Sequence, residues 1–343
     1  MAARMFDGQG PEVPRIAVDA MGGDYAPDEI VAGALAAADE GHEIILVGDQ
    51  RRLAPLVRRH ERVRICDAAE SISMDEPPAQ ALRRCDATSL GVAVNLVREG
   101  EAEAVVSAGN SGAFLAIALI RLRTIEGIAR PAIAAVLPAK EGPIVLIDAG
   151  ANVDCRPEWL VQFAIMGSAY AEGVLGIEAP RVGIVSVGEE RAKGNAQAIE
   201  AAALLDAAPV NFVGNVEGKD ILFNHADVVV TDGFVGNVIL KVGEGAAVLL
   251  GSATRDTLVH SNALVKLGAL LVKPALDKLK LRFSYESYGG APLLGVRGHC
   301  IVAHGRANRN AMRNAIRAAA RAARENVVGH IESVVAPLVA KEA

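Results

Sequence analysis

Aromatic residues are scarce in this sequence. Phe, Trp and Tyr make up only 3% of its 343 residues, so the core must be built from Ala, Val, Leu and Ile. That composition, with 34 glycines, favours parallel strands under Ala-rich helices over an all-β sandwich. Cysteine is scarce as well. The four cysteines form no C-x-x-C pair, which argues against a zinc site or a disulfide framework and predicts reduced thiols.

Several motifs that carry chemistry are missing. The sequence has no P-loop, no G-x-S-x-G turn and no H-E-x-x-H pair, which argues against a P-loop enzyme, a serine hydrolase and a metal-dependent enzyme. Gly243-Glu244-Gly245 is followed by Val248 where a dinucleotide fingerprint needs a third glycine, so we interpret these glycines as close packing inside a helix. The net charge of −6 argues against a nucleic-acid partner.

The remaining features predict a cytoplasmic chain without a membrane span. Residues 1–14 lack the apolar segment of a secretory signal and are expected to form a mobile tail. The longest uncharged stretch, residues 104–120, is interrupted by polar residues at 109–112, so we divide it into a strand, a turn and a helix. Residues 15–343 are expected to form a single large α/β domain.

Short β-branched runs alternate with Ala-rich stretches of helical length. This alternation predicts βαβ units and a mainly parallel sheet with helices on both faces. Residues 138–143 leave no room for a helix between two strands, so we expect a hairpin there and a mixed sheet. The predicted strands are residues 15–19, 43–47, 63–66, 104–107, 132–137, 144–148, 181–187, 210–213, 227–231 and 300–303.

Small and polar residues follow most of these strands. In open α/β sheets, ligands bind outside the carboxyl ends of strands, against helix N-termini, but strand-to-helix turns also need Gly, Asn and Asp for their own conformation. Lys193 follows such a turn and precedes a helix, where it would either hold an anion or be a solvated first-turn lysine. His304 closes the last strand and would be either an acid–base group or a structural histidine.

Two basic segments stand out in this acidic chain. Residues 258–283 predict an amphipathic helical hairpin in which Leu264, Leu267 and Leu271 share a face and Pro274 starts a second helix. Its net charge of +4 fits membrane contact, while a dimer interface or a core helix remains an alternative. The second segment is a row of arginines on one helical face without interleaved acids, which indicates either an acidic partner or a solvated face. Its members are Arg306, Arg309, Arg313, Arg317, Arg321 and Arg324.

From Arg15 to about Glu332 the sequence resembles the bacterial phosphate acyltransferase family of phospholipid synthesis. The motifs that carry the resemblance are residues 16–24 (IAVDAMGGD), 107–113 (SAGNSGA), 148–154 (DAGANVD), 193–195 (KGN), 228–237 (VVVTDGFVGN) and 288–291 (YGGA). After His304-Gly305 the chain has Arg306-Ala307-Asn308-Arg309 where the family often has small polar residues, which makes this loop a departure from the pattern.

The resemblance implies a three-layer α/β/α sandwich related to phosphotransacetylases and isocitrate-type dehydrogenases. It implies that inorganic phosphate attacks acyl-acyl-carrier protein directly, giving acyl phosphate and free carrier protein, with no cofactor and no covalent acyl-enzyme. It also implies a homodimer, contact of the 258–283 hairpin with the inner face of the cell membrane, and hand-off of acyl phosphate to a membrane glycerol-phosphate acyltransferase.

The residues suit this chemistry, because phosphate is already a nucleophile and needs only orientation and oxyanion stabilisation. We predict that Lys193 supplies positive charge, that Asn195 and Asn237 donate hydrogen bonds, and that His304 serves the thioester oxygen or the leaving sulfur. Arg313 and Arg317 would contact the carrier protein. The predicted substrate-binding residues are Asn110, Ser111, Gly112, Asp148, Asn152, Asp232 and Gly233, with Asp148 and Asp232 ordering the donors.

Three alternatives share some of these features. A phosphotransacetylase acting on a CoA thioester would use the same fold, but it would leave the lysine-rich hairpin without a purpose. A nicotinamide-dependent decarboxylating dehydrogenase would need a metal-binding carboxylate cluster and an arginine clamp that the sequence does not assemble. A non-catalytic membrane scaffold for lipid enzymes would have no need of polar turns at so many strand ends.

Overall fold

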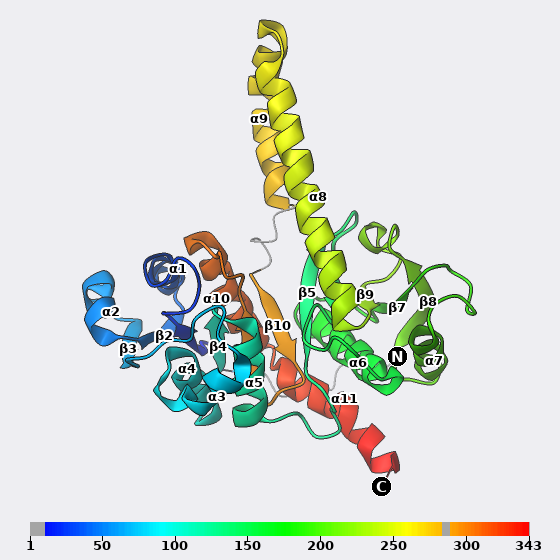
Figure 1. The fold of residues 1–343 in the computed structure, drawn as a ribbon, viewed down its shortest axis with the longest axis horizontal. Helices are drawn as coiled ribbons and strands as arrows, with labels where there is room; N and C mark the ends of the chain where they lie inside the picture. The colour runs from blue at the N-terminus through cyan, green and yellow to red at the C-terminus, as the bar shows by residue number, and fades with distance from the viewer. Residues whose placement is uncertain (1–10, 283–288, 343) are drawn as a thin grey trace.

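A computed structural model describes residues 11–282 and 289–342, and omits the side chains of residues 277, 279–282 and 338–342. Most of the predicted N-terminal tail, Phe283 and the first residue of the YGGA motif lie outside the described residues. The described chain forms a wide α/β body from which one helical hairpin projects (Figure 1).

Eleven strands form one mixed sheet in the described part of the chain. They are β1 Arg15–Asp19, β2 Glu43–Gly48, β3 Val63–Asp67, β4 Ala104–Ser107, β5 Ala132–Pro138, β6 Pro143–Ile147, β7 Arg181–Ser186, β8 Asn211–Glu217, β9 Val228–Val230, β10 Ala291–Leu294 and β11 His299–Val302. Their order is β3-β2-β1-β4-β11-β10-β5-β6-β9-β7-β8.

The direction of the strands reverses across the sheet. Strands β1 to β4 and β11 are mutually parallel. Antiparallel pairing of β11 with β10, of β10 with β5 and of β5 with β6 follows. Strands β6, β9, β7 and β8 are again mutually parallel, but they run opposite to the first group. Two parallel groups of opposite direction therefore share one sheet.

The predicted strands agree with the structure except for β10, which the sequence analysis missed. The hairpin predicted around residues 138–143 is confirmed as the antiparallel pair β5–β6. In β10, Gly289 and Gly290 precede the strand and Pro292 lies within it, and both features indicate a turn rather than a strand. The strand forms because its neighbours β11 and β5 pair with it on both sides.

Helices cover both faces of the sheet, as predicted. They are α1 Asp28–Asp39, α2 Gln50–Val57, α3 Pro78–Arg83, α4 Ser89–Arg98, α5 Ser111–Leu122, α6 Pro157–Gly173, α7 Ala196–Leu205, α8 Gly233–His260, α9 Ala263–Arg282, α10 Arg309–Arg324 and α11 Val327–Glu342. Alternation along β1 decides the layers: Ile16 and Val18 pack with α1 and α10, while Ala17 packs with α4 and α5.

The second half of the sheet is built in the same way. Val145 and Ile147 of β6 pack with α6, α7 and α11, while Ile144 and Leu146 face the other side, where α8 contributes Ile239 and Leu240. The result is the three-layer α/β/α sandwich that the resemblance implied.

The structure contains the predicted helical hairpin, but the predicted residue bounds and the predicted break between its helices at Pro274 are wrong. Its arms are α8 and α9, which pack against each other, so it begins at Gly233 rather than at residue 258. Pro274 lies inside α9 and does not start a second helix. Gly243 and Gly245 lie on α8 with no described atom within 4 Å of where a Cβ would stand, so they do not mark close packing within this chain.

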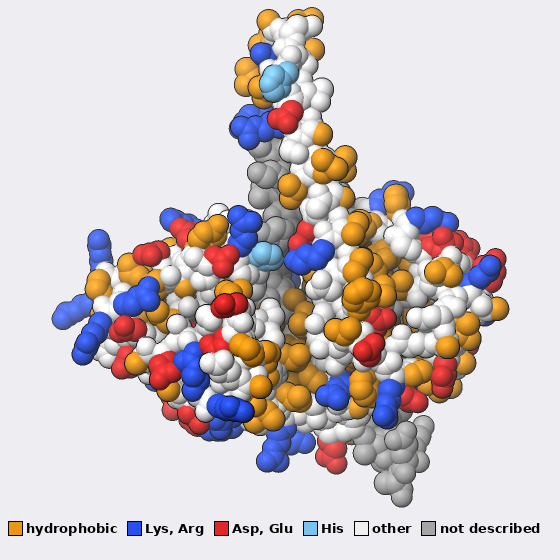
Figure 2. Space-filling view, viewed as in Figure 1, with side chains coloured by type: hydrophobic (Ala, Val, Ile, Leu, Met, Phe, Trp, Pro, Cys, Tyr) orange, Lys and Arg blue, Asp and Glu red, His pale blue; other side chains and the backbone are white. Residues whose placement is uncertain are grey.

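The hairpin leaves apolar side chains exposed. Helix α8 is long and apolar enough, by length and composition, to cross a membrane, and only 11% of that apolar window is buried. Hydrophobic and basic (Lys or Arg) side chains both lie along the projecting arms (Figure 2). The three leucines predicted to share a face, Leu264, Leu267 and Leu271, are 78%, 57% and 78% exposed.

We expect a histidine on β11 to make stability fall in mild acid. His299 lines a small cavity with Tyr170 and Val327, and burial lowers its pKa from 6.5 to about 4. Between pH 6.5 and 4, His299 binds a proton in the unfolded chain but stays neutral in the folded chain. The unfolding free energy should therefore fall by up to about 1.4 kcal/mol per pH unit between pH 6.5 and 4, and this contribution is fully present above pH 6.5.

Urea unfolding of wild type and His299→Gln at pH 7 and pH 5 measures this effect. The variant should lose less stability than wild type on going from pH 7 to pH 5. His225→Gln is the control, because the His225 side chain is 55% exposed. An equal pH-dependent loss in wild type and His299→Gln would contradict the assignment.

Candidate active site

A buried carboxylate organises the loop after β6. Asp148 is fully buried, and its Oδ1 accepts hydrogen bonds from the amides of Ile133, Gly150 and Ala151 at 3.1, 3.0 and 2.9 Å. Its Oδ2 accepts from the amide and the side-chain Nδ2 of Asn152 at 2.7 and 2.9 Å. Burial raises the pKa of Asp148, and these donors oppose that rise. Asp148 therefore fixes the backbone of this loop and the Asn152 side chain, and its role in the reaction stays a prediction.

The loop held by Asp148 lies against the start of α8. The Gly233 amide donates to the Asn152 carbonyl oxygen at 2.7 Å, and a Cβ at Gly233 would lie 2.6 Å from that oxygen. At Gly236 a Cβ would collide with the carbonyl oxygen of Asp148. Asn237 Nδ2 donates to the Ala149 carbonyl oxygen at 3.3 Å. The two glycines thus allow a close approach, which explains their place in this motif.

The N-termini of two helices meet at a pocket of about 410 Å³. Asn195 caps α7 through a 2.8 Å hydrogen bond from the Ala198 amide to its Oδ1, and Asp232 caps α8 through a 2.8 Å bond from the Val235 amide. Helix N-termini carry partial positive charge and attract anions. The pocket is lined by Val153, Asp154, Cys155, Asn195, Gln197, Asp232, Phe234 and Val235.

Cys155 in this pocket is not an activated nucleophile. Burial, followed by the nearby negative charge of Asp148, raises the pKa of its thiol to about 12. The thiol therefore stays protonated near neutral pH, where a nucleophilic cysteine needs a lowered pKa. This property agrees with a reaction that uses no acyl-cysteine.

Lys193 lies two residues before the Asn195 cap, in the turn between β7 and α7. Its side chain is exposed, and its backbone is fixed: its amide donates to the Glu190 carbonyl oxygen at 2.9 Å, and its own carbonyl oxygen accepts from Ser186 Oγ at 2.9 Å. A Cβ at Gly188 would lie 3.0 Å from Lys193 Cγ. The backbone around the lysine is thus held while its ammonium group reaches solvent.

The turn before α5 uses its asparagine differently from the prediction. Asn110 is buried; its Oδ1 accepts from the Ala113 amide at 3.0 Å, and its Nδ2 donates to the carbonyl oxygens of Ser73, Met74 and Glu76 at 3.2, 3.1 and 2.8 Å. The side chain caps the helix and fastens the loop at 73–76. Any anion contact in this turn would come from Ser111, which is exposed, and from backbone amides.

His304 and Gly305 follow β11 and lie against the loop after β1. The Asp24 amide donates to the Gly305 carbonyl oxygen at 2.8 Å, and His304 Nδ1 accepts from the Arg306 amide at 3.1 Å. The hydrogen bond from Arg306, in the same loop, orients the half-buried imidazole ring of His304.

The predicted residues follow two sets of strands that run in opposite directions. Asn110, Ser111, Gly112 and His304 follow β4 and β11, whereas Asp148, Asn152, Lys193, Asn195, Asp232, Gly233 and Asn237 follow β6, β7 and β9. The contacts above join the loop at 148–152 to Gly233 and Asn237, and Asn195 meets Asp232 at the pocket. The sequence analysis treated all these turns alike, since strand direction cannot be read from local pattern. It also missed the pocket residues Val153, Cys155, Gln197 and Phe234, which carry no motif of their own.

Arg309, Arg313 and Arg317 of the arginine row are paired with acids from a distant segment, and Arg306 lies before α10 rather than on it. Arg309 binds Glu29 through two bonds of 3.2 and 2.6 Å, and Arg317 binds Glu40 at 2.6 and 2.5 Å. Arg313 Nε lies 3.9 Å from Glu40. These arginines lower the pKa of Glu29 and Glu40. The acids belong to or follow α1, about 280 residues away, so inspection of α10 alone could not find them.

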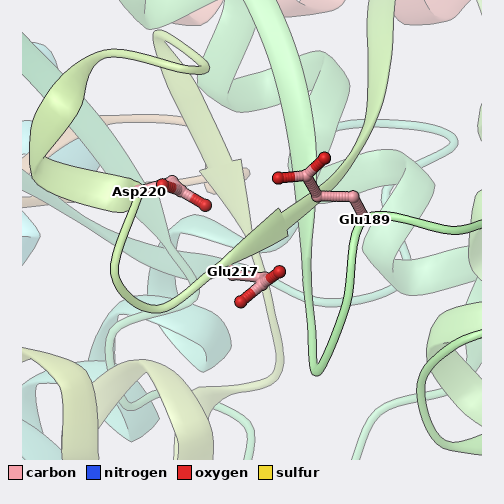
Figure 3. Close-up of side chains that lie close together, drawn as sticks. All are labelled: Glu189, Glu217 and Asp220. Atoms are coloured by element: carbon pink, nitrogen blue, oxygen red, sulfur yellow. The ribbon is translucent and has the colours of Figure 1, made fainter.

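Three carboxylates cluster beyond β7 and β8 (Figure 3). One oxygen from each of Glu189, Glu217 and Asp220 lies within 4.8 Å of the others, a spacing that a metal ion would accept. Two basic side chains already lie there: Lys219 Nζ is 3.2 Å from Glu217, and the His225 ring Nε2 is 3.8 Å from Asp220. The prediction that the protein has no metal stays a prediction.

Solved structures with a similar fold include phosphotransacetylases and a dehydrogenase. A phosphotransacetylase from Streptococcus pyogenes superposes with a TM-score of 0.59 at 17% identity, covering 91% of this chain and 94% of that one. A 4-hydroxythreonine-4-phosphate dehydrogenase from Klebsiella pneumoniae gives a TM-score of 0.54 at 16% identity over 91% and 99% of the two chains. These likenesses define the class of fold.

Sequence relatives narrow the class to one family. Residues 14–330 match the family model described as fatty acid synthesis protein. The chain is 53% identical over 303 residues to a phosphate acyltransferase from Moorella thermoacetica, covering 87% of this chain and 89% of the relative. It is 49% identical to one from Heliobacterium modesticaldum over 94% and 99% of the two chains. The chain belongs to the phosphate acyltransferase family, as the motifs indicated.

Proposed function

We propose that the protein transfers an acyl group from acyl-acyl-carrier protein to inorganic phosphate, which supplies acyl phosphate for phospholipid synthesis. The observation that carries the proposal is the pocket at the N-termini of α7 and α8, with Lys193 in the adjoining turn. This arrangement offers partial and full positive charge to an anionic nucleophile without a serine or a low-pKa cysteine. A phosphate oxygen attacks the thioester carbon, and the pantetheine thiolate leaves.

Lys193 stabilises phosphate or the tetrahedral oxyanion, and Asn195 and Asn237 donate hydrogen bonds to the same oxygens. Asp148, Asn152, Asp232 and Gly233 hold the start of α8, and with it Asn237, through the contacts described above. Ser111, Gly112 and the start of α5, with Asn110 as the cap, would cradle phosphate, and His304 would serve the thioester oxygen or the departing sulfur. Orientation of the two reactants is the main contribution that this site makes to the rate.

We infer that Arg313 and Arg317 also contact the acidic carrier protein, although Glu40 already pairs with them. Reversal of both charges to Glu should raise KM for the carrier protein about tenfold with little change in kcat, because remote binding is lost. Glu40→Gln is the matched control, since it breaks the same ion pairs and leaves the arginines in place. An unchanged KM in the charge-reversed enzyme would limit these arginines to holding α10 on α1.

The hairpin is the proposed contact with the inner face of the cell membrane. Its exposed leucines would enter the lipid interface while Lys266 and Lys273 face anionic headgroups. Such an enzyme would work as a cytoplasmic homodimer held peripherally on the membrane, where a glycerol-phosphate acyltransferase takes up the acyl phosphate. Dimerisation and membrane contact would then share this element.

Thiol release from palmitoyl-acyl-carrier protein, measured with and without inorganic phosphate, tests the proposed reaction. Release that depends on phosphate is the expected result. Release from palmitoyl-CoA alone would replace the proposal with a CoA-dependent phosphotransacetylase, the alternative that the fold also permits. Inactivity toward both thioesters would favour a non-catalytic scaffold.

A further inference from the structure

A second buried carboxylate lies at the end of β1, where the sequence analysis assigned no role. Asp19 is 2% exposed. Its Oδ1 accepts from the Met21 amide at 3.2 Å, and its Oδ2 accepts from Ser107 Oγ at 2.7 Å. Ser107 and Ser89 of α4 lower the pKa of this carboxyl group, but burial raises it by more. A buried charge of this kind is retained only where the chain surrounds it with donors.

Ser107 connects Asp19 to the turn before α5 through hydrogen bonds. Its Oγ donates to Asp19 and accepts from the Gly109 amide at 3.0 Å, so one hydroxyl links the carboxylate to the turn backbone. The loop after β1 presses on the same turn. A Cβ at Gly22 would collide with Asp19 Oδ2 and lie 2.9 Å from Gly109 Cα. The glycines let the two loops touch directly above the carboxylate.

The loop after β11 is tied to this assembly from the other side. The Asp24 amide donates to the Gly305 carbonyl oxygen, and a Cβ at Gly23 would lie 3.1 Å from that oxygen. His304, next to Gly305, therefore stands on a loop whose place depends on the Gly22–Gly23 backbone. Three loops, after β1, β4 and β11, meet above one buried carboxylate.

The other half of the protein repeats this plan. Asp148 directly follows β6 and accepts hydrogen bonds from its own loop. Strand β9 pairs with β6, and the helix after β9, α8, begins against that loop at Gly233. In the same way Asp19 ends β1 beside β4, whose following helix α5 begins just after Gly109. A buried aspartate that sets a helix N-terminus is thus used twice.

We propose that Asp19, acting through Ser107, is a positioning residue for the phosphate cradle at Gly109–Ser111 and for His304. The inference rests on the proposed phosphate-dependent transfer. In this proposal Asp19 does not contact substrate. Its carboxylate fixes the direction of the Gly109 amide through Ser107, and the loop at Gly22–Gly23 fixes the position of Gly305.

Ser107→Ala is the sharpest variant, and Ser89→Ala is its matched control. Both remove one buried serine hydroxyl that lowers the pKa of Asp19, but only Ser107 also holds the Gly109 amide. We expect both variants to lose similar stability in urea unfolding. Ser107→Ala should also raise KM for phosphate about tenfold while KM for the acyl thioester stays within about twofold, and Ser89→Ala should leave both constants near wild type.

Hydrogen–deuterium exchange gives a readout that does not depend on activity. The amides from Gly109 to Ala113 should exchange faster in Ser107→Ala than in Ser89→Ala or wild type. Equal exchange and equal phosphate KM in the two serine variants would overturn the positioning role. An inactive wild-type enzyme would instead refute the proposed reaction, while faster exchange confined to Ser107→Ala would still support the control of the turn by Asp19 and Ser107.

Discussion

Replacement of Lys193 by Ala is expected to lower turnover about a hundredfold or more, the loss seen when one oxyanion-stabilising donor is removed. That factor corresponds to about 2.7 kcal/mol of transition-state stabilisation. The structure supports a clean experiment, because the Lys193 side chain is exposed and the turn is held by backbone bonds to Glu190 and Ser186. The variant should therefore fold normally. Phosphate-dependent thiol release measures the effect.

Lys219→Ala is the control for Lys193. Lys219 is an exposed lysine in the same half of the sheet, 3.2 Å from Glu217 and outside the turn that leads to Asn195, so its loss tests the general effect of one missing charge. It should retain nearly full turnover. Lys193→Arg separates charge from shape, because a partial recovery would indicate a need for positive charge. A folded Lys193→Ala enzyme with a near-normal rate would remove this lysine from the site.

Conversion of the hairpin leucines to serine is expected to abolish binding to anionic vesicles. Leu264, Leu267 and Leu271 are exposed on one face of α9. Burial of a leucine side chain contributes roughly 1.5–3 kcal/mol, so loss of all three should weaken membrane partitioning by more than about a hundredfold. Flotation with vesicles of phosphatidylglycerol and phosphatidylcholine measures the partitioning, and activity toward soluble thioester should stay near wild type.

A leucine outside the hairpin provides the control for vesicle binding. Leu222 is 45% exposed on the α/β body, and Leu222→Ser should leave flotation unchanged. Sedimentation velocity on the triple variant tests the competing role of the same face. A dimer that falls apart while vesicle binding persists would assign the leucines to subunit contact instead of to the membrane.

The buried aspartates and the capping asparagines show where sequence reasoning reached its limit. The turns after the strands were found because Gly, Asn and Asp mark them, but the same residues serve turn geometry and ligand binding alike. Asn110 proved to be occupied by a helix cap and by three carbonyl oxygens of a distant loop. Asp19 belonged to a recognised motif and received no role, because its partner Ser107 lies 88 residues away.

The sequence by itself determined the α/β class, ten of the strands, the β5–β6 hairpin and the family, since each depends on local periodicity or on residues in order along the chain. Tertiary structure alone decided four further features: the opposite directions of the two strand groups, the insertion of β10, the full length of the hairpin arms and the pairing of α10 arginines with acids near α1. The physical reason is the same in each case. These features depend on contacts between segments that are far apart in the chain. Such contacts produce no hydrophobic periodicity in either segment, so neither segment predicts them by itself.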